Sequence, residues 1–89
     1  MPERSVVVAS HVGLHARPAA LFSQAAAEAR VPVSLTSASG RTVNAASILG
    51  VLSLGIDHGE RVTLSCDADG ADSVLDALVA LLEQDLDEE

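Results

Sequence analysis

Several short apolar runs alternate with polar residues at a period of two, the pattern of strands that bury one face. The clearest is Arg61–Cys66, in which Val62, Leu64 and Cys66 alternate with polar residues. β-Branched composition and flanking turn residues predict three further strands. These are Arg4–Ala9, Val31–Thr36 and Arg41–Asn44. Because Ser37–Gly40 is rich in turn-forming residues, the last two of these strands are expected to form a hairpin.

Apolar positions elsewhere follow helical spacing. From Ala16 to about Ala29 the chain is rich in alanine, and one face repeats apolar residues at intervals of three and four. That face is made of Phe22, Ala25, Ala26 and Ala29. The segment Ser47–Gly55 is short, opens with a serine that can cap a helix and ends in glycine. It predicts a brief second helix rather than a strand.

The last helix has the most regular apolar stripe in the chain. The stripe consists of Val74, Leu75, Leu78, Val79, Leu81, Leu82 and Leu86. Asp69 is expected to cap its amino end, and Asp72 suits the positive end of the helix dipole.

The resulting order, βαββαβα, predicts an α+β fold with helices on one face of an antiparallel sheet. The 89 residues are enough for one domain, spanning 1–89, with one core. Since Phe22 is the only aromatic residue, that core must be packed from Val, Leu, Ile and Ala.

The net charge and the distribution of basic residues limit which kinds of molecule the protein is expected to bind. The formal net charge is −8, and the five basic residues are scattered arginines with no lysine among them. Nucleic acid is not expected as a partner, because binding to its phosphates needs clustered positive charge. The acidic stretch Glu83 to Glu89 is expected to be a solvated helix end and tail. With one cysteine, Cys66, and neither a signal peptide nor a membrane-spanning run, a cytoplasmic protein without membrane insertion is expected.

The candidate chemistry lies in the run HVGLHARPAALF, from His11 to Phe22. Proline is tolerated in the first turn of a helix, so Pro18 predicts that the helix begins just before it, with His15 at the open end. The first-turn amides and the helix dipole make such an end suitable for an anion. The same positive end favours an uncharged, nucleophilic imidazole. Arg17 can hydrogen-bond phosphate oxygens with its planar fork. A lone histidine here could also be a capping or surface residue.

The run Gly13–Ala19, sequence GLHARPA, closely resembles the active-site signature of the histidine-containing phosphocarrier (HPr) family of the bacterial phosphoenolpyruvate-dependent sugar phosphotransferase system. A second block, Ser47–Gly55, resembles that family's regulatory segment. Length and element order also agree, so the resemblance covers nearly the whole chain. It implies an HPr-like open-faced β-sandwich whose four-stranded sheet has the order 1-4-2-3, with three helices on one side.

The resemblance also implies a mechanism. His15 is expected to accept a phosphoryl group on Nδ1 from phosphorylated enzyme I and to pass it to the A domain of a sugar-specific enzyme II. The phosphate oxygens are expected to meet the amides of Ala16 and Arg17, with Arg17 steadying the group and Pro18 fixing the helix start. Such a protein is a phosphoryl carrier rather than an enzyme, works without a cofactor and is expected to be a monomer.

The second block has two proposed roles. In relatives, the residue matching Ser47 can be phosphorylated by an HPr kinase, which here is open to question because Ala46 stands where many kinase-controlled relatives have lysine. Alternatively, Ser47 only caps the short helix. Ile48, Leu49 and Leu52 are expected to form an apolar docking patch, although they could instead all belong to the core.

The chain departs from the family pattern at two other places. Val12 stands where many relatives have Ser or Thr, and Gln24 lies on a first helix that lacks the lysines of relatives. Docking onto an acidic enzyme I should therefore depend more on Arg17 and apolar contact than on salt-sensitive charge pairs.

Two other readings remain. His11 and His15 lie four residues apart, a spacing used by metal ligands, but Gly13 and Pro18 place both outside regular helix and no third ligand is near, so no metal site is expected. His58 is expected to lie at the surface. The alternative function is an HPr-like regulatory or signalling paralogue, of the nitrogen-type or dihydroxyacetone kinase branch. It would act by binding a protein such as a transcriptional regulator.

Overall fold

The computed structural model of the chain describes residues 2–9 and 13–84. Its elements alternate in the predicted βαββαβα order. They are β1 (Glu3–Val7), α1 (Ala16–Glu28), β2 (Ser34–Thr36), β3 (Thr42–Asn44), α2 (Ile48–Ser53), β4 (Arg61–Ser65) and α3 (Ala71–Leu82).

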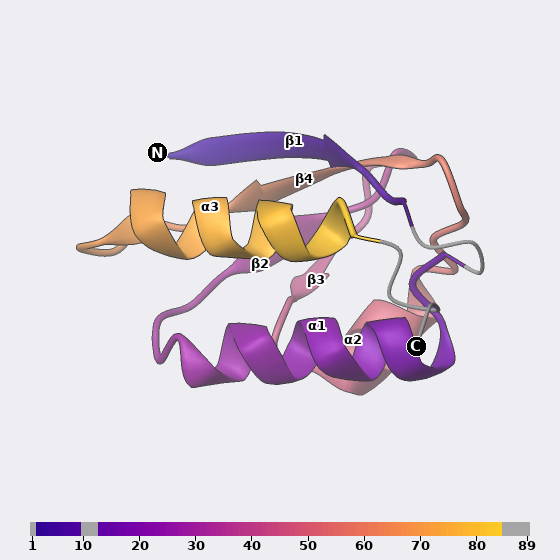
Figure 1. Ribbon diagram of the computed structural model, residues 1–89, viewed down its shortest axis with the longest axis horizontal. Helices are drawn as coiled ribbons and strands as arrows, with labels where there is room; N and C mark the ends of the chain where they lie inside the picture. The colour runs from indigo at the N-terminus through magenta and orange to yellow at the C-terminus, as the bar shows by residue number, and fades with distance from the viewer. Residues whose placement is uncertain (1, 10–12, 85–89) are drawn as a thin grey trace.

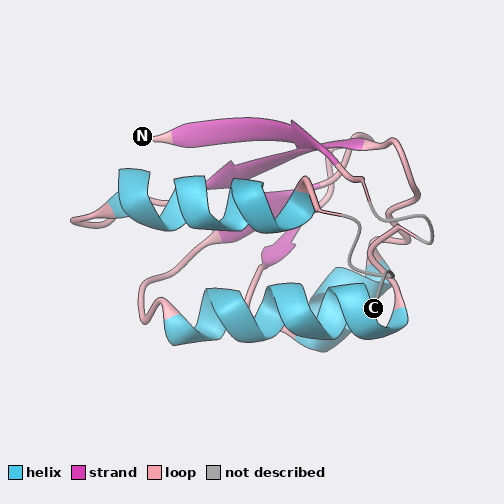
Figure 2. Ribbon diagram, in the orientation of Figure 1, coloured by secondary structure: helices cyan, strands magenta, loops and turns pink. Residues whose placement is uncertain are grey.

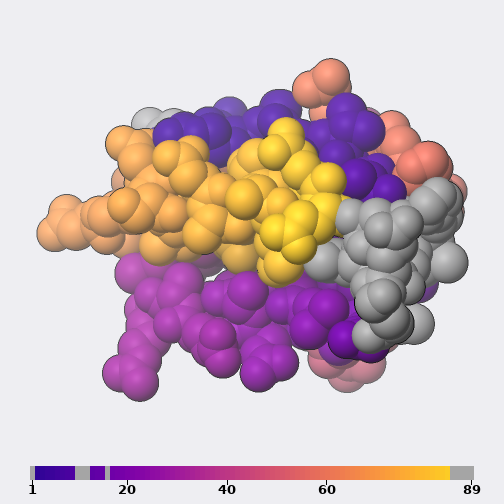
Figure 3. Space-filling view, viewed as in Figure 1, coloured from indigo at the N-terminus to yellow at the C-terminus, as the bar shows by residue number. Residues whose placement is uncertain are grey.

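The four strands form one antiparallel sheet in the order β1-β4-β2-β3, which confirms the expected topology. The three helices pack on one side of the sheet, as Figures 1 and 2 show. α1 and α3 run in opposite directions, so the start of α1 lies at the same end of the molecule as the end of α3 (Figure 1). In the space-filling view, α3 covers the front between β1 and α1 (Figure 3).

The core lies between the sheet and the helices and is almost entirely aliphatic. On β4, Val62 and Leu64 are buried while the alternate positions face outward, as the period of two predicts. Phe22 is completely buried on α1. The buried positions of α3 are Ala71, Leu75, Leu78 and Leu82, which confirms the predicted stripe as far as residue 84. Leu86 lies outside the described residues.

All four strands are shorter than predicted, by one to three residues. The first is shorter at its end because the N–H groups of Val8 and Ala9 donate to Glu60 and Leu82 carbonyls, at 3.0 and 3.1 Å, outside the regular ladder. β2 begins at Ser34 rather than Val31, since Pro32 has no N–H to contribute to a sheet. The remaining differences, including a start of β3 one residue late, concern single terminal residues.

The predicted cap of the last helix is wrong. Asp69 does not cap α3: its N-cap is Gly70, at a φ of 78°, and no side chain makes a capping hydrogen bond there. The chain enters the helix through a left-handed turn, which glycine adopts without the penalty that a Cβ brings. Asp69 is therefore one residue too early to bond the first-turn amides. Asp72 does lie in the first turn, as predicted.

A charged contact outside the core joins β1 to α3. The guanidinium of Arg4 donates to Asp72 and Asp76, each at 3.1 Å. These hydrogen bonds raise the pKa of Arg4 above its usual value. Since the groups are exposed to solvent, the contact is expected to add little to the free energy of unfolding.

Candidate functional site

His15 stands at the amino end of α1, as the sequence predicts. It is the N-cap residue, with extended backbone (φ −127°, ψ 160°), and its side chain makes no capping hydrogen bond. The interpretation of His15 as a capping side chain is therefore wrong. The ring is available for another purpose.

The residues on either side of this histidine fix its backbone. Leu14 and Pro18 are buried completely, whereas 41% of the His15 side chain is exposed. Pro18 is the third residue of the helix, where the N–H that it lacks would have had no partner within the helix. The chain is anchored on both sides while the imidazole reaches solvent.

The amino end of α1 provides positive potential next to the ring. The N–H groups of Ala16 and Arg17 belong to the first turn, which directs them out of the helix end. No acidic side chain lies in that turn to offset the dipole. The side chain of Arg17 is exposed two residues from His15. This combination can bind an anion beside a nucleophile.

An acidic residue that the sequence analysis did not single out also lies at the site. Oδ1 of Asp57 is 3.8 Å from Nε2 of His15. The available signal was Gly13: its φ is +73°, and a Cβ there would lie 2.8 Å from the Cα of Asp57. A glycine at the start of the run Gly13–Ala19 is therefore consistent with close approach of a second backbone segment, but the sequence does not say which segment.

α2 has the predicted serine cap. Oγ of Ser47 accepts a hydrogen bond from the N–H of Gly50 at 3.1 Å, and Ser47 itself is exposed. The cap is confirmed, and it leaves the hydroxyl at the surface.

The three large apolar residues expected to form a docking patch are at the surface. Ile48, Leu49 and Leu52 are 40%, 77% and 37% exposed, whereas Val51 is the buried residue of α2. The reading that all three belong to the core is therefore wrong. A six-residue helix presents too narrow a buried face to cover four large side chains.

The apolar patch and the histidine belong to adjoining elements. α2 packs against α1, and the chain after α2 reaches Ile56, whose carbonyl accepts the N–H of Leu14 at 2.9 Å. The start of α1 and the loop at Asp57 therefore meet at His15, and α2, which carries the exposed apolar residues, packs beside α1.

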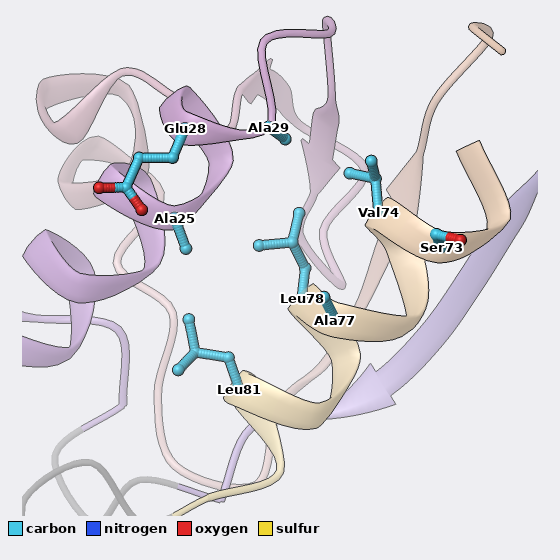
Figure 4. A pocket seen from close by; sticks show the side chains of 8 residues that line it. All are labelled: Ala25, Glu28, Ala29, Ser73, Val74, Ala77, Leu78 and Leu81. Atoms are coloured by element: carbon cyan, nitrogen blue, oxygen red, sulfur yellow. The ribbon is translucent and has the colours of Figure 1, made fainter. Parts of the chain in front are cut away.

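A separate groove lies between α1 and α3 and encloses about 430 Å³. Leu78 and Leu81 point from α3 toward Ala25 on α1, while the carboxylate of Glu28 points away (Figure 4). Ala25 is ten residues from His15, about 15 Å along the helix. The groove is thus remote from the histidine.

Two residues discussed in the sequence, His11 and Val12, lie outside the described residues. Across residues 2–9 and 13–84, no group of three His, Cys, Asp or Glu side chains is arranged to hold a metal ion. In the same ranges, no helix is long and apolar enough to cross a membrane.

The fold and site define a class of small α+β proteins that present one half-exposed histidine at the amino end of their first helix. Within that class, the chain belongs to the HPr family. Residues 2–84 match the family model described as "PTS HPr component phosphorylation site". Membership supports a phosphocarrier role in the phosphotransferase system, rather than that of a catalytic enzyme.

Comparisons with individual relatives support membership of the same family. The chain is 48% identical to the phosphocarrier protein HPr of Streptomyces coelicolor, over 99% of this chain and 95% of that protein. The solved structure of HPr-C-His from Thermoanaerobacter tengcongensis superposes with a TM-score of 0.90 at 39% identity, covering 100% and 99% of the two chains. A structure described as an HPr dimer from the same organism gives a TM-score of 0.71 at 40% identity, covering 93% and 94%.

Proposed function

We propose that this protein accepts a phosphoryl group on Nδ1 of His15 from phosphorylated enzyme I and donates it to the A domain of a sugar-specific enzyme II. The observation that carries the proposal is the half-exposed imidazole at the amino end of α1, which is not used as a cap. Its Nε2 faces Asp57, which supports Nδ1 as the nitrogen that reacts.

The residues around His15 suit a temporary phosphoryl group. The amides of Ala16 and Arg17 and the guanidinium of Arg17 would receive its oxygens, while Pro18 fixes the start of the helix. Charge–dipole interactions at an exposed helix end are worth about 0.3–1 kcal/mol each. Stabilisation of this size favours the phosphorylated state without trapping it. In-line transfer between two docked proteins needs mainly positioning and charge stabilisation.

The exposed face of α2 is proposed as the docking patch for both partners. Ile48, Leu49 and Leu52 would be covered by enzyme I in one step and by the enzyme II A domain in the next. Apolar side chains that remain exposed in the free protein are typical of protein-binding surfaces. The protein is proposed to act as a cytoplasmic, single-domain monomer without a cofactor, and light scattering during size-exclusion chromatography measures that oligomeric state.

The proposal is tested by incubating the protein with enzyme I and labelled phosphoenolpyruvate. Phosphohistidine is acid-labile and stable in base, so label with those properties is expected on the wild-type protein. It should be absent from His15→Ala and retained by His58→Ala, a matched variant at an exposed histidine. Labelling of His15→Ala to the wild-type level would contradict the assignment.

Ser47 is proposed as a second, regulatory phosphorylation site. Its hydroxyl is exposed at the amino end of α2, where an added phosphate suits the helix dipole and changes the charge of the adjoining docking patch. Mass spectrometry after incubation with an HPr kinase and ATP should show one added phosphoryl group, absent from Ser47→Ala. If only binding to a transcriptional regulator is found, and His15 is never charged, the regulatory-paralogue alternative holds instead.

A further inference from the structure

We propose that Asp57 is a positioning residue for His15. Its carboxylate holds the imidazole with the proton on Nε2, which leaves the lone pair on Nδ1 for the phosphoryl group. This role rests on the proposed phosphocarrier function, and it assigns the loop after α2 a part in the chemistry.

The contact itself gives the direction of the effect. Oδ1 of Asp57 lies 3.8 Å from Nε2 of His15, with the two side chains 85% and 41% exposed. An ionised carboxylate can only accept hydrogen bonds, so the nitrogen that faces it is favoured to carry the proton. At 3.8 Å the contact is electrostatic, because it is too long for a hydrogen bond.

The loop that carries Asp57 is held against the start of α1. The N–H of Leu14 donates to the carbonyl of Ile56 at 2.9 Å. Gly13 lies so close to this backbone that a Cβ would be 2.8 Å from the Cα of Asp57. The two segments therefore approach as closely as a residue without a side chain permits.

A second carboxylate holds the loop from the other side. Oε1 of Glu60 accepts the N–H of Asp57 at 3.2 Å, and its Oε2 accepts the N–H of Ala38 at 3.0 Å. The N–H of Glu60 also donates to the carbonyl of Asp57 at 3.1 Å. The Asp57 backbone is thus fixed although its side chain is solvated, so the carboxylate starts from a defined position.

In the proposed role, every bond that forms in the transfer is matched by one that breaks, and no proton moves. The Nδ1 lone pair of His15 forms the new N–P bond, and the donor's bond to phosphorus breaks with its electron pair returning to the phosphorylated partner. The ring then carries a phosphoryl group on Nδ1 and a proton on Nε2, so it is cationic. Asp57 stabilises that charge. In the onward step, the N–P pair returns to Nδ1 and the ring is again neutral with its proton on Nε2.

Other charged groups on the same two segments are expected to act differently. Arg17, on α1, and the amino end of that helix are positive and favour the phosphoryl oxygens. His58 follows Asp57 in the same loop. Asp57 is the carboxylate that the structure places against Nε2. Its removal is therefore expected to change the tautomer ratio of the ring rather than the binding of the phosphoryl oxygens.

The first test reads the tautomer of His15 in the unphosphorylated protein by ¹⁵N NMR at a pH where the ring is neutral. In Asp57→Ala, the ratio of the Nε2–H form to the Nδ1–H form should fall by about 1.5-fold to fivefold, the range of an exposed charge contact. Asp67→Ala removes an exposed carboxylate beyond the far end of β4 and should leave the ratio unchanged. An unchanged ratio in Asp57→Ala, or an equal change in both variants, overturns the proposal.

The second test follows the rate at which the phosphorylated protein loses its phosphoryl group to water, as a function of pH. Water releases it faster from the ring protonated on Nε2, because the leaving group is then neutral imidazole. Asp57 is expected to stabilise that cationic ring, so at pH values where only part of the protein carries the proton, Asp57→Asn should lose the phosphoryl group about 1.5-fold to fivefold more slowly. Asp67→Asn is the control, and superimposable profiles for wild type and Asp57→Asn overturn the proposal.

The two tests separate this inference from the proposed function. The tautomer measurement needs neither enzyme I nor a phosphoryl group, so it gives a result even if His15 is never charged. Conversely, the wild-type protein could be phosphorylated normally while the tautomer ratio is the same in Asp57→Ala. That result would support the phosphocarrier function and contradict the positioning role of Asp57.

Discussion

At the scale of single residues, the geometry at His15 depends on two neighbours that each lack a group found in most residues. Gly13 has no Cβ, which lets the loop carrying Asp57 pack against the start of α1. Pro18 has no N–H, and at its place in the first turn none is needed. Both residues shape the backbone, and the histidine is left half-exposed between buried neighbours.

Gly13→Ala is expected to destabilise the protein by about 2–4 kcal/mol. The cost combines a positive φ with a collision between the new Cβ and the backbone of Ile56 and Asp57. Gly40→Ala is the matched control, since Gly40 also has a positive φ (96°) but nothing within 4 Å. It should cost only about 1–2 kcal/mol. Urea unfolding measures both, and equal losses would show that the close approach is unimportant.

At the scale of elements, α2 combines two features in six residues. Its buried residue Val51 attaches it to the core, while its other large side chains remain at the surface. The Ser47 cap offsets the weak intrinsic stability of so short a helix. The segment is therefore suited to present a surface rather than to build the core.

Ser47→Ala should lower the free energy of unfolding by about 1 kcal/mol, because the N–H of Gly50 loses its acceptor. Ser47→Asp keeps a capping oxygen and should unfold close to wild type. Urea denaturation of the two variants gives the comparison. A loss in Ser47→Asp as large as that in Ser47→Ala would argue against capping as the stabilising contact.

Leu49→Asp should reduce the rate of phosphoryl transfer from enzyme I by about tenfold or more while leaving the fold intact. Leu49 is 77% exposed, so its replacement removes little buried area, whereas a charge at the centre of an apolar contact opposes docking. Ser73→Asp adds the same charge on an exposed position of α3 and serves as control. Circular dichroism checks folding. Normal transfer by a folded Leu49→Asp would remove α2 from the docking surface.

At the scale of the whole molecule, charge is distributed unusually for a protein expected to bind an acidic partner. The net charge is −8 and there is no lysine in the chain. If the proposed docking onto an acidic enzyme I is correct, long-range attraction is expected to be weak, and apolar contact at α2 together with Arg17 is expected to supply most of the affinity.

The rate of phosphoryl transfer from enzyme I should accordingly change by less than about threefold between low and high salt, because few charge pairs are available for screening. Gln24→Lys places a lysine on the exposed side of α1 and should make the rate more salt-sensitive. Stopped-flow or quenched-flow transfer assays at several ionic strengths measure both. A steep loss for the wild-type protein would contradict this view of docking.

Much of the fold follows from local patterns in the sequence. The period of two at Val62 and Leu64, and the helical stripe around Leu75 and Leu78, each assign a buried face before any packing is known. The start of α1 directly after His15 also follows locally, from Pro18. The cap of α3 does not follow locally: Asp69 is the expected cap, whereas the structure places Gly70 there, in a left-handed turn.

The sequence alone thus determined the elements, their order and the histidine at the open end of α1, because periodicity, proline and capping preferences act over a few residues. Only the tertiary structure decided that Asp57 faces His15 and that Ile48, Leu49 and Leu52 remain at the surface. Those facts depend on contacts between segments some forty residues apart, which are set by how the helices and loops close over one sheet. Patterns within a few residues of sequence do not specify which distant segments come into contact.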